Sequence, residues 1–185
     1  MHPKPSRPPH GRSLIELMVA LTVLTLMASL GLPDLQGWWR HRAVLVHAEA
    51  FRSAARLSRA LALERQTVVT LCAREADDTG QTHACAAAGR DWSQGWLAFV
   101  DSGERGRVDG PDRILHVQVP TRPAGRVVST ARYISFQPTG VSLSAASRFT
   151  FLPLDAPAGA LAAAGDLLVC VNKPGRARII DADAC

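Results

Sequence analysis

The N-terminal part of the chain is dominated by one apolar run. The 19 residues from Leu14 to Leu32 contain a single charged side chain, the carboxylate of Glu16. Coiled as a helix, they span about 28 Å, close to the hydrocarbon thickness of a bilayer. We therefore expect a transmembrane helix over 12–33. An acidic group in such a segment costs up to about 3 kcal/mol at mid-membrane, so Glu16 needs a cationic partner.

A second helical segment follows the apolar run. Gly31, Pro33 and Gly37 are expected to interrupt the helix. Helical spacing resumes from Trp38 to about Arg65, within a second half of the helix that covers 34–66. This half is amphipathic, because its apolar residues fall near one face: Val44, Ala48, Phe51, Ala55 and Ala62.

Beyond the helix the apolar residues follow the spacing of strands. Short runs rich in β-branched and aromatic residues alternate with turns rich in Gly, Pro and Asp. The expected strands cover 67–72, 95–100, 114–119, 127–136, 148–154, 167–171 and 177–180. One long helix followed by an antiparallel sheet predicts an α+β fold, with the apolar stripe of the helix lying on the sheet.

Charge is modest and is carried mostly by arginine. The formal net charge is +5, and all but two of the 21 basic residues are Arg, which can contact phosphate through two nitrogens. On the helix, Arg52, Arg56 and Arg59 recur at i, i+4 and i+7. We interpret this stripe either as a solvated face, assisted by Glu49 one turn earlier, or as a contact with other subunits or a polyanion.

The residues around Glu16 carry a resemblance to a known processing signal. A short basic leader, residues 1–11, ends in Gly11 and is followed shortly by Leu-Ile-Glu-Leu-Met-Val. This arrangement resembles the type IV prepilin signal. The resemblance implies that a prepilin peptidase cuts after Gly11 and N-methylates Arg12, where the family usually has Phe. Glu16 would then pair with the N-terminus of a neighbouring subunit during filament assembly, and the helix over 12–33 would join the filament core.

An ordinary secretory signal and a plain membrane anchor are the alternatives. A cleavable signal has an apolar core of about 7–15 residues followed by a small-x-small site. The run here is longer, contains Glu16 and ends in Ala28-Ser29-Leu30, which matches such a site poorly. Lys4 and Arg7 favour a cytoplasmic leader, which would make the chain a single-pass inner-membrane protein with its C-terminal domain in the periplasm.

All four cysteines lie beyond the apolar run, where the expected compartment permits oxidation. Their spacing favours two local bridges, Cys72–Cys85 and Cys170–Cys185, although four cysteines allow three pairings. Each bridge would contribute roughly 3 kcal/mol in the chain-entropy model. A zinc site is the rival interpretation, but no C-x-x-C pair supports it.

A second resemblance narrows the family. The segment Asp91-Trp92-Ser93-Gln94-Gly95-Trp96, followed by Phe99-Val100-Asp101, resembles the signature of the GspH/FimT pseudopilin family. Leu71-Cys72 and Tyr133-Ile134-Ser135-Phe136, followed by Pro138 and Gly140, add to the resemblance, which covers most of the chain from Gly11 to Ile180. It implies a type IV pilin-like fold in which the long N-terminal helix packs on a C-terminal antiparallel β domain, residues 67–185.

A basic turn near the C-terminus is the candidate binding site. Asn172, Pro174 and Gly175 predict a turn between two apolar strands. Arg176 and Arg178 stand two apart on an extended segment, so their side chains point to one face with Cα atoms roughly 6.6 Å apart. This is about two phosphate steps along one strand of B-DNA. Lys173 adds a third positive charge.

The motif Gly-Arg-x-Arg resembles the DNA-contacting element of FimT-type minor pilins. By that resemblance Gly175 shapes the turn, while Arg176 and Arg178 hold phosphates of double-stranded DNA. The alternative is an exposed edge strand whose charges guard against aggregation.

The sequence offers no clear catalytic or metal motif. Residues 101–109 superficially resemble a calcium loop, but Gly103 and Arg105 stand where carboxylates or amides would be required, so a plain hairpin loop is favoured. The histidines are scattered, and neither H-E-x-x-H nor G-x-S-x-G occurs. We expect no enzyme activity, cofactor or metal.

The sequence thus predicts a minor pilin or pseudopilin of a type IV pilus or a type II secretion filament. Its expected partners are a prepilin peptidase, other pilin subunits, the inner membrane and, in one interpretation, double-stranded DNA taken up in natural transformation. The competing interpretation is a purely structural GspH-like pseudopilin of the type II secretion system. A membrane-tethered periplasmic binding domain that never enters a filament is a third hypothesis, from a different class.

Overall fold

The computed structural model describes residues 13–75, 83–87, 90–119, 125–144, 146–156, 166–180 and 185. Its contacts divide the chain into two compact units, Met1–Trp39 and Arg40–Cys185.

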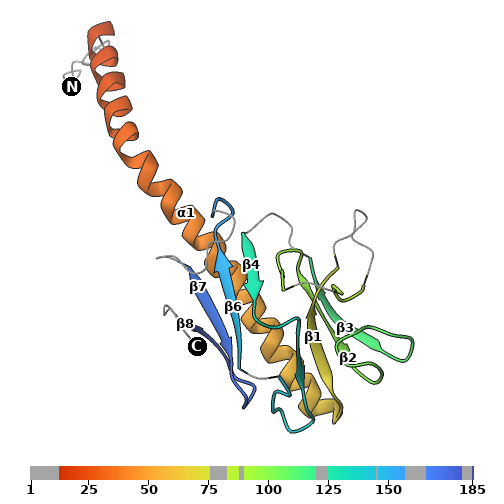
Figure 1. Cartoon of the computed structure of the whole chain (residues 1–185). Coiled ribbons are helices and arrows are strands. Elements are labelled where there is room, and N and C mark those ends of the chain that lie inside the picture. Colours follow the sequence, from red (N-terminus) through yellow and green to blue (C-terminus); the bar gives the residue numbers. More distant parts are fainter. Residues whose placement is uncertain are drawn as a thin grey trace, which may run out of the picture. The chain divides into compact units, whose positions relative to one another are not determined.

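The first unit contains the beginning of helix α1, which runs from Leu14 to Arg65 (Figure 1). The helix begins after Ser13, whose carbonyl oxygen accepts the backbone N–H groups of Glu16 and Leu17 at 3.0 and 3.3 Å. Glu16 lies in the first turn, where a carboxylate interacts favourably with the positive end of the helix dipole. Large apolar side chains are exposed along this segment: Leu14, Ile15, Leu17, Met18, Val19, Leu21, Val23, Leu24, Leu26 and Met27.

The interruption predicted at Gly31, Pro33 and Gly37 is wrong, because helical backbone runs through all three residues. A proline removes one backbone donor but leaves the hydrogen bonds of the other residues in place, so a long helix can continue past it. Among the described residues, no helix combines the length and the apolar character needed to cross a membrane.

The second unit contains two antiparallel sheets of four strands each, rather than the single sheet that was predicted (Figure 1). In the first sheet the order is β3-β2-β1-β5, and in the second it is β4-β6-β7-β8. Their bounds are β1 Val69–Ala73, β2 Trp96–Val100, β3 Arg113–Gln118, β4 Arg126–Ser129, β5 Tyr133–Phe136, β6 Ser147–Leu152, β7 Leu167–Val171 and β8 Ala177–Ile180.

The division into two sheets occurs inside the segment 127–136, which was predicted to be one strand. Its first half, β4, pairs with β6, whereas its second half, β5, pairs with β1. The hydroxyl of Ser129 accepts the N–H of Ala131 at 3.0 Å and donates to the carbonyl of Arg148 at 2.9 Å. The bond to Ala131 lies within three residues and is of the kind by which Ser favours a turn over a strand ladder.

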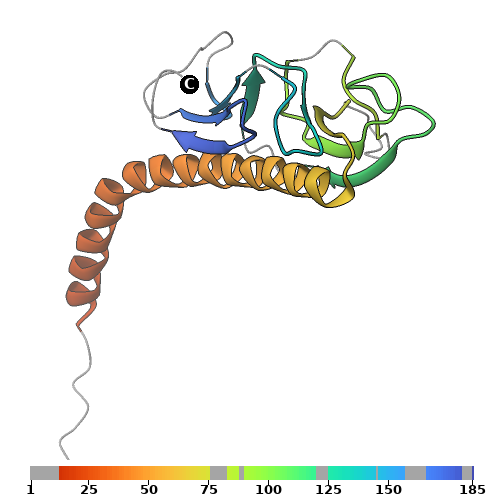
Figure 2. The ribbon, with the colours of Figure 1, turned by 90° about the horizontal axis from the view of Figure 1, so that it is seen from below.

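The core lies between α1 and both sheets, and the predicted apolar face of the helix is confirmed. Val44, Ala48, Phe51, Ala55 and Ala62 are all buried in one cluster with residues of both sheets. Figure 2 shows the part of α1 in this unit running along the two sheets. Phe51 is the centre of the cluster, because its ring lies 4.3–5.8 Å from the rings of Trp92, Trp96, Phe149 and Phe151.

The tryptophan-containing signature segment joins the two sheets. Trp92 donates its indole N–H to the carbonyl of Ala131 at 3.0 Å, and its backbone N–H to Val127 of β4 at 2.8 Å. The hydroxyl of Ser93 accepts the N–H of Val127 at 2.9 Å, while Trp96 opens β2. The segment therefore ties β4 of one sheet to β2 of the other. Both indoles are fully buried.

Both expected disulfides are present. Cys72–Cys85 anchors the segment after β1, and Cys170–Cys185 ties the C-terminal residue to β7, with Cα atoms 5.7 and 5.6 Å apart. Each closes a short loop, so each removes conformational freedom mainly from the unfolded chain.

Candidate functional site

The basic turn forms a tight hairpin between β7 and β8, as the sequence predicted. Val171 faces Ala177 and Cys170 faces Arg178 in the ladder. The carbonyl of Asn172 accepts the N–H of Gly175 at 2.8 Å, and its side-chain oxygen accepts the N–H of Arg176 at 2.9 Å. Gly175 has a φ of 76°, a left-handed conformation that favours glycine. The turn is therefore held by Asn172 and permitted by Gly175.

The cationic side chains of this hairpin face solvent. Lys173, Arg176 and Arg178 are exposed, whereas Ala177 between the two arginines is buried. Because side chains alternate along a strand, this pattern places the two guanidinium groups on one face, as expected from their spacing.

The arginine stripe of α1 does not act as one solvated face. Arg52 forms an ion pair with Glu49 one turn earlier, which neutralises it locally. Arg59 instead donates its Nε–H to the carbonyl of Gly140 at 2.8 Å, across the interface between helix and β domain. Arg56 is exposed one turn before Arg59. The three arginines thus have different environments.

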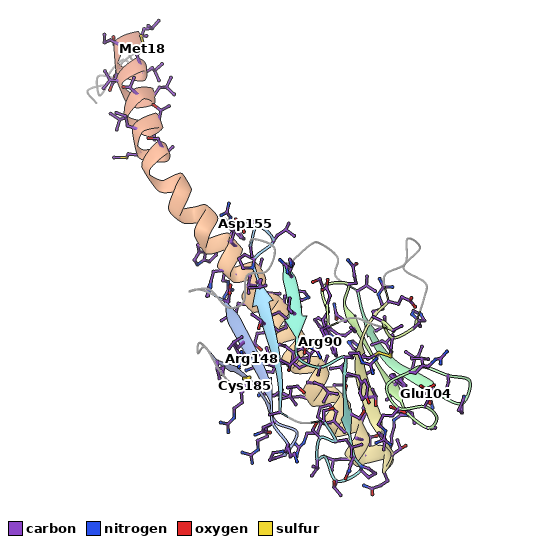
Figure 3. The ribbon with its side chains drawn as sticks, in the orientation of Figure 1. Met18, Arg90, Glu104, Arg148, Asp155 and Cys185 are labelled. Carbon is purple, nitrogen blue, oxygen red and sulfur yellow. A yellow bond between two sulfur atoms is a disulfide. The ribbon has the colours of Figure 1, made fainter. Side chains whose placement is uncertain are left out.

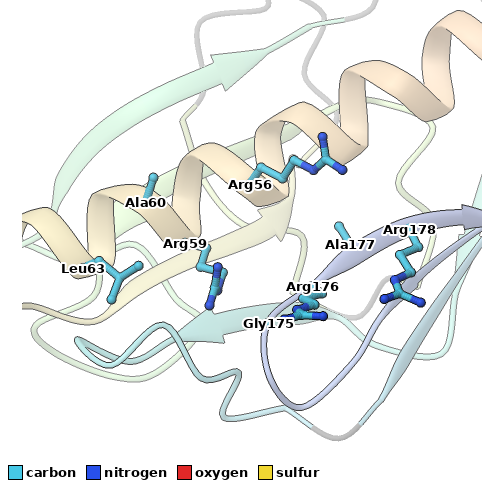
Figure 4. Close-up of a pocket in the computed structure, with 8 residues that line it drawn as sticks. All are labelled: Arg56, Arg59, Ala60, Leu63, Gly175, Arg176, Ala177 and Arg178. Atoms are coloured by element: carbon cyan, nitrogen blue, oxygen red, sulfur yellow. The ribbon is translucent and has the colours of Figure 1, made fainter.

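Arg56 and Arg59 lie with the basic hairpin around one pocket of about 240 Å³ (Figure 4). In the close-up, Arg59 extends from α1 toward the turn that carries Arg176, and Arg178 follows on β8. The lining comprises Arg56, Arg59, Ala60, Leu63, Gly175, Arg176, Ala177 and Arg178. Within the described part of the chain, every charged side chain of this lining is an arginine. Such a pocket attracts anions, and guanidinium groups are well suited to phosphate.

Two glycines allow helix and hairpin to approach closely behind the pocket. A Cβ on Gly175 would lie 2.3 Å from the carbonyl oxygen of Gly140 and 2.9 Å from Nε of Arg59. Gly140 also has a positive φ of 76°. In addition, Ser142 donates its N–H to the carbonyl of Lys173 at 2.8 Å. The Gly140 loop, which belongs to the family signature, therefore buttresses the basic turn.

The sequence indicated the hairpin arginines, but it did not indicate that they share a pocket with Arg56 and Arg59. The two groups are more than one hundred residues apart, so spacing gives no signal for it. The available clue was the conjunction of an unexplained helical arginine stripe with the signature glycine, Gly140.

The loop between β2 and β3 uses its carboxylates for its own structure. Asp101, Asp109 and Asp112 accept the backbone N–H groups of Gly106, Glu104 and Ser102 at 3.0, 2.9 and 2.8 Å. Such bonds stabilise a hairpin loop. Among the described residues, no group of acidic, His or Cys side chains is arranged to hold a metal ion.

The processing residues Gly11 and Arg12 lie outside the described residues. Glu16 is described and is exposed at the start of α1.

Comparison with known proteins places this fold in a family. The family model described as Type II transport protein GspH matches residues 47–180, which is more than half of the chain. The chain belongs to the GspH family. The matched region contains the tryptophan signature, both sheets and the basic hairpin. The chain is therefore a minor pilin or pseudopilin of the GspH/type IV pilin kind.

A solved structure of a type IV minor pilin shows a similar fold. A crystal structure of the Pseudomonas aeruginosa type IV minor pilin FimU is 12% identical, with a TM-score of 0.52, covering 74% of this chain and 87% of that one. A second crystal form of FimU gives 12% identity and a TM-score of 0.49, covering 72% and 89%. None of the curated protein sequences compared with the chain matches it.

Membership of this family has two consequences. Its members are structural pilins rather than enzymes, and other pilin subunits are expected partners. The apolar side chains exposed along the first turns of α1 are consistent with a surface that is buried when the subunit assembles with other pilins.

Proposed function

We propose that this GspH-family pilin is a minor filament subunit that binds DNA through its β7–β8 hairpin. The observation that carries the DNA-binding part is the exposed Gly-Arg-Ala-Arg turn, in which Arg176 and Arg178 share one face. Lys173 adds charge, and Gly175 permits the shape of the turn. Recognition of this kind contacts phosphates and is blind to base sequence.

The magnitude of such binding follows from the number of phosphate contacts. Two arginine contacts to duplex DNA give a slope of log K against log salt of about −1.8, and Lys173 would raise it to about −2.7. Binding would therefore be weak at physiological salt. A filament that presents the subunit at its tip needs only transient capture of a long polymer.

The test is a salt titration of DNA binding by the full-length protein in non-ionic detergent, using a fluorescent duplex of about 30 base pairs. The Arg176→Ala/Arg178→Ala variant should bind more weakly and lose about 1.8 from the slope. The Arg105→Ala/Arg113→Ala variant is the matched control, because it removes two exposed arginines near the other sheet. Equal loss in both variants, or in neither, would refute a DNA site at the hairpin.

A purely structural role in type II secretion is the second candidate, and the family description favours it. In that case the hairpin arginines only protect an exposed edge. Alanine substitution of Arg176 and Arg178 would leave DNA binding at the level of the control, while loss of the subunit would impair protein secretion.

The N-terminal part of the proposal concerns processing and assembly. We infer that a prepilin peptidase removes residues 1–11, that the inner membrane holds the apolar helix with the β domain in the periplasm, and that Glu16 pairs with the new N-terminus of a neighbouring subunit. The run of exposed apolar side chains from Leu14 supports this. Mass spectrometry of the mature protein should find a methylated Arg12. An intact Met1 would instead favour a tethered binding domain outside any filament.

The assembly role of Glu16 has its own test. Glu16→Gln keeps the size of the side chain but removes its charge, so the variant should be depleted from purified filaments while its amount in the cell is unchanged. Glu75→Gln serves as the control, because it removes a carboxylate outside the apolar run. Normal incorporation of the Glu16 variant would exclude the pairing.

A further inference from the structure

The pocket between α1 and the β7–β8 hairpin has a second cationic wall that the Gly-Arg-x-Arg motif does not include. Arg56 and Arg59 of the helix line it opposite Arg176 and Arg178 (Figure 4). Four guanidinium groups therefore border one hollow of about 240 Å³. If the hairpin arginines only protected an exposed edge strand, no additional arginines on α1 would be required beside them.

The arginines of the pocket are not neutralised by carboxylates in the described structure. Arg52 pairs with Glu49, but Glu49 is absent from the pocket lining. Arg56, Arg176 and Arg178 form no ion pair among the described residues, and the lining contains no acidic side chain there. Like charges gathered in a hollow repel one another, and a bound anion relieves that repulsion.

Arg59 is held in place for such contact. Its Nε–H is used by the carbonyl of Gly140 at 2.8 Å, which fixes the plane of the guanidinium group and leaves its terminal nitrogens available. Gly140 and Gly175 leave space for this side chain, since a Cβ on either would come within 3.2 Å of Nε of Arg59. A fixed guanidinium loses less entropy on binding than a mobile one.

We propose that Arg56 and Arg59 are direct DNA-binding residues, and that the sugar–phosphate backbone of a strand lies in the groove between α1 and the hairpin. This assignment rests on the proposed DNA-binding function and extends it from two arginines to four. The hollow is too small for a whole duplex, so it receives phosphodiester groups that project from one. The helix then contributes as many phosphate contacts as the motif itself.

The experiment measures duplex binding by full-length protein as a function of salt, comparing the parent with Arg56→Ala. Four contacts give a slope of about −3.6, and loss of one contact lowers its magnitude by about 0.9. The same relation makes Arg56→Ala roughly eightfold weaker at about 0.1 M salt. Arg105→Ala is the control; its neighbour Glu104 lies on the side of the β domain away from Cys185 (Figure 3). It should retain the parent slope and affinity.

Arg59 is tested by a variant that separates charge from position. Arg59→Ala removes both the contact and the bond to Gly140, so its thermal unfolding is measured alongside its binding. Arg59→Lys keeps the charge and should recover part of the affinity. If Arg56→Ala and Arg59→Ala both bind as the control does, Arg56 and Arg59 are excluded as DNA-binding residues. DNA binding by the hairpin itself is tested separately, by the Arg176→Ala/Arg178→Ala variant.

The source of the phosphate is determined by competition. Closed circular plasmid has no ends, so it should displace the labelled duplex as well as linear DNA of equal nucleotide concentration. If only DNA with a 5′-phosphorylated end displaced the labelled duplex, the pocket would bind a terminal phosphate. That result would contradict binding of the sugar–phosphate backbone. If millimolar inorganic phosphate displaced the labelled duplex and circular DNA did not, backbone binding in the pocket would likewise be excluded.

Discussion

Gly175→Ala offers a sharp test of how the helix supports the basic turn. The added Cβ would lie 2.3 Å from the carbonyl oxygen of Gly140, well inside the 3.0 Å that real Cβ contacts respect. That carbonyl also accepts the Nε–H of Arg59, so moving it away weakens a hydrogen bond to a charged donor. The substitution therefore affects both the turn and the pocket.

The cost has two parts. A non-glycine residue at a φ of 76° loses about 1–2 kcal/mol. Loss of a hydrogen bond from a charged group adds about 1.5–3 kcal/mol where the loop cannot follow. Partial relaxation of the Gly140 loop reduces the sum, so we expect the free energy of unfolding to fall by about 2–4 kcal/mol. For a chain of this size, Tm should then fall by at least about 4 °C.

The assay is urea unfolding followed by tryptophan fluorescence, since Trp92 and Trp96 are buried in the core. Gly110→Ala is the matched control, because a Cβ there meets nothing within 4 Å and its φ is not positive. It should change stability by less than about 0.5 kcal/mol. If Gly175→Ala is as stable as Gly110→Ala and binds DNA like the parent, the close approach has no energetic importance.

Three further predictions concern the β domain. Phe51→Ala removes the ring at the centre of the aromatic cluster and should lower the free energy of unfolding by about 3–5 kcal/mol; Phe51→Leu should cost clearly less. Burial against Trp96 lowers the pKa of His47, so the folded state binds this proton less readily than the unfolded chain, and stability should fall as pH drops below about 6.5. His47→Phe should remove that part of the acid sensitivity, as measured by urea unfolding between pH 7.5 and 5. Cys72→Ser/Cys85→Ser should lower stability by roughly 3 kcal/mol, and reducing agent should then destabilise the variant less than the parent.

Each of these has a contradictory outcome. A Phe51→Ala variant as stable as Phe51→Leu would mean that the cluster repacks fully. Identical pH dependence of the parent and of His47→Phe would mean that another group causes the acid sensitivity. Equal destabilisation of the Cys72 double variant and the parent by reducing agent would show that the first bridge contributes nothing.

The local elements of this fold were predictable from sequence because they depend on spacing. The apolar residues Val44, Phe51 and Ala62 recur at the helical period, so the buried face of α1 followed directly. Asn172 and Gly175 indicated the hairpin by turn chemistry that acts within four residues. The tryptophan signature indicated the family, which the match over 47–180 bears out.

Tertiary structure decided which of these elements meet. Two sheets form instead of one because the chain changes its pairing partner between β4 and β5, where the hydroxyl of Ser129 accepts the N–H of Ala131. Arg59 donates a hydrogen bond to the carbonyl of Gly140, which lies against Gly175 of the basic hairpin. These three residues lie in different parts of the sequence. The sequence determines where the charges are along the chain, but a pocket requires distant segments to pack together. The helix and the hairpin approach closely because Gly140 and Gly175 have no side chains, and this packing brings the four arginines around one pocket.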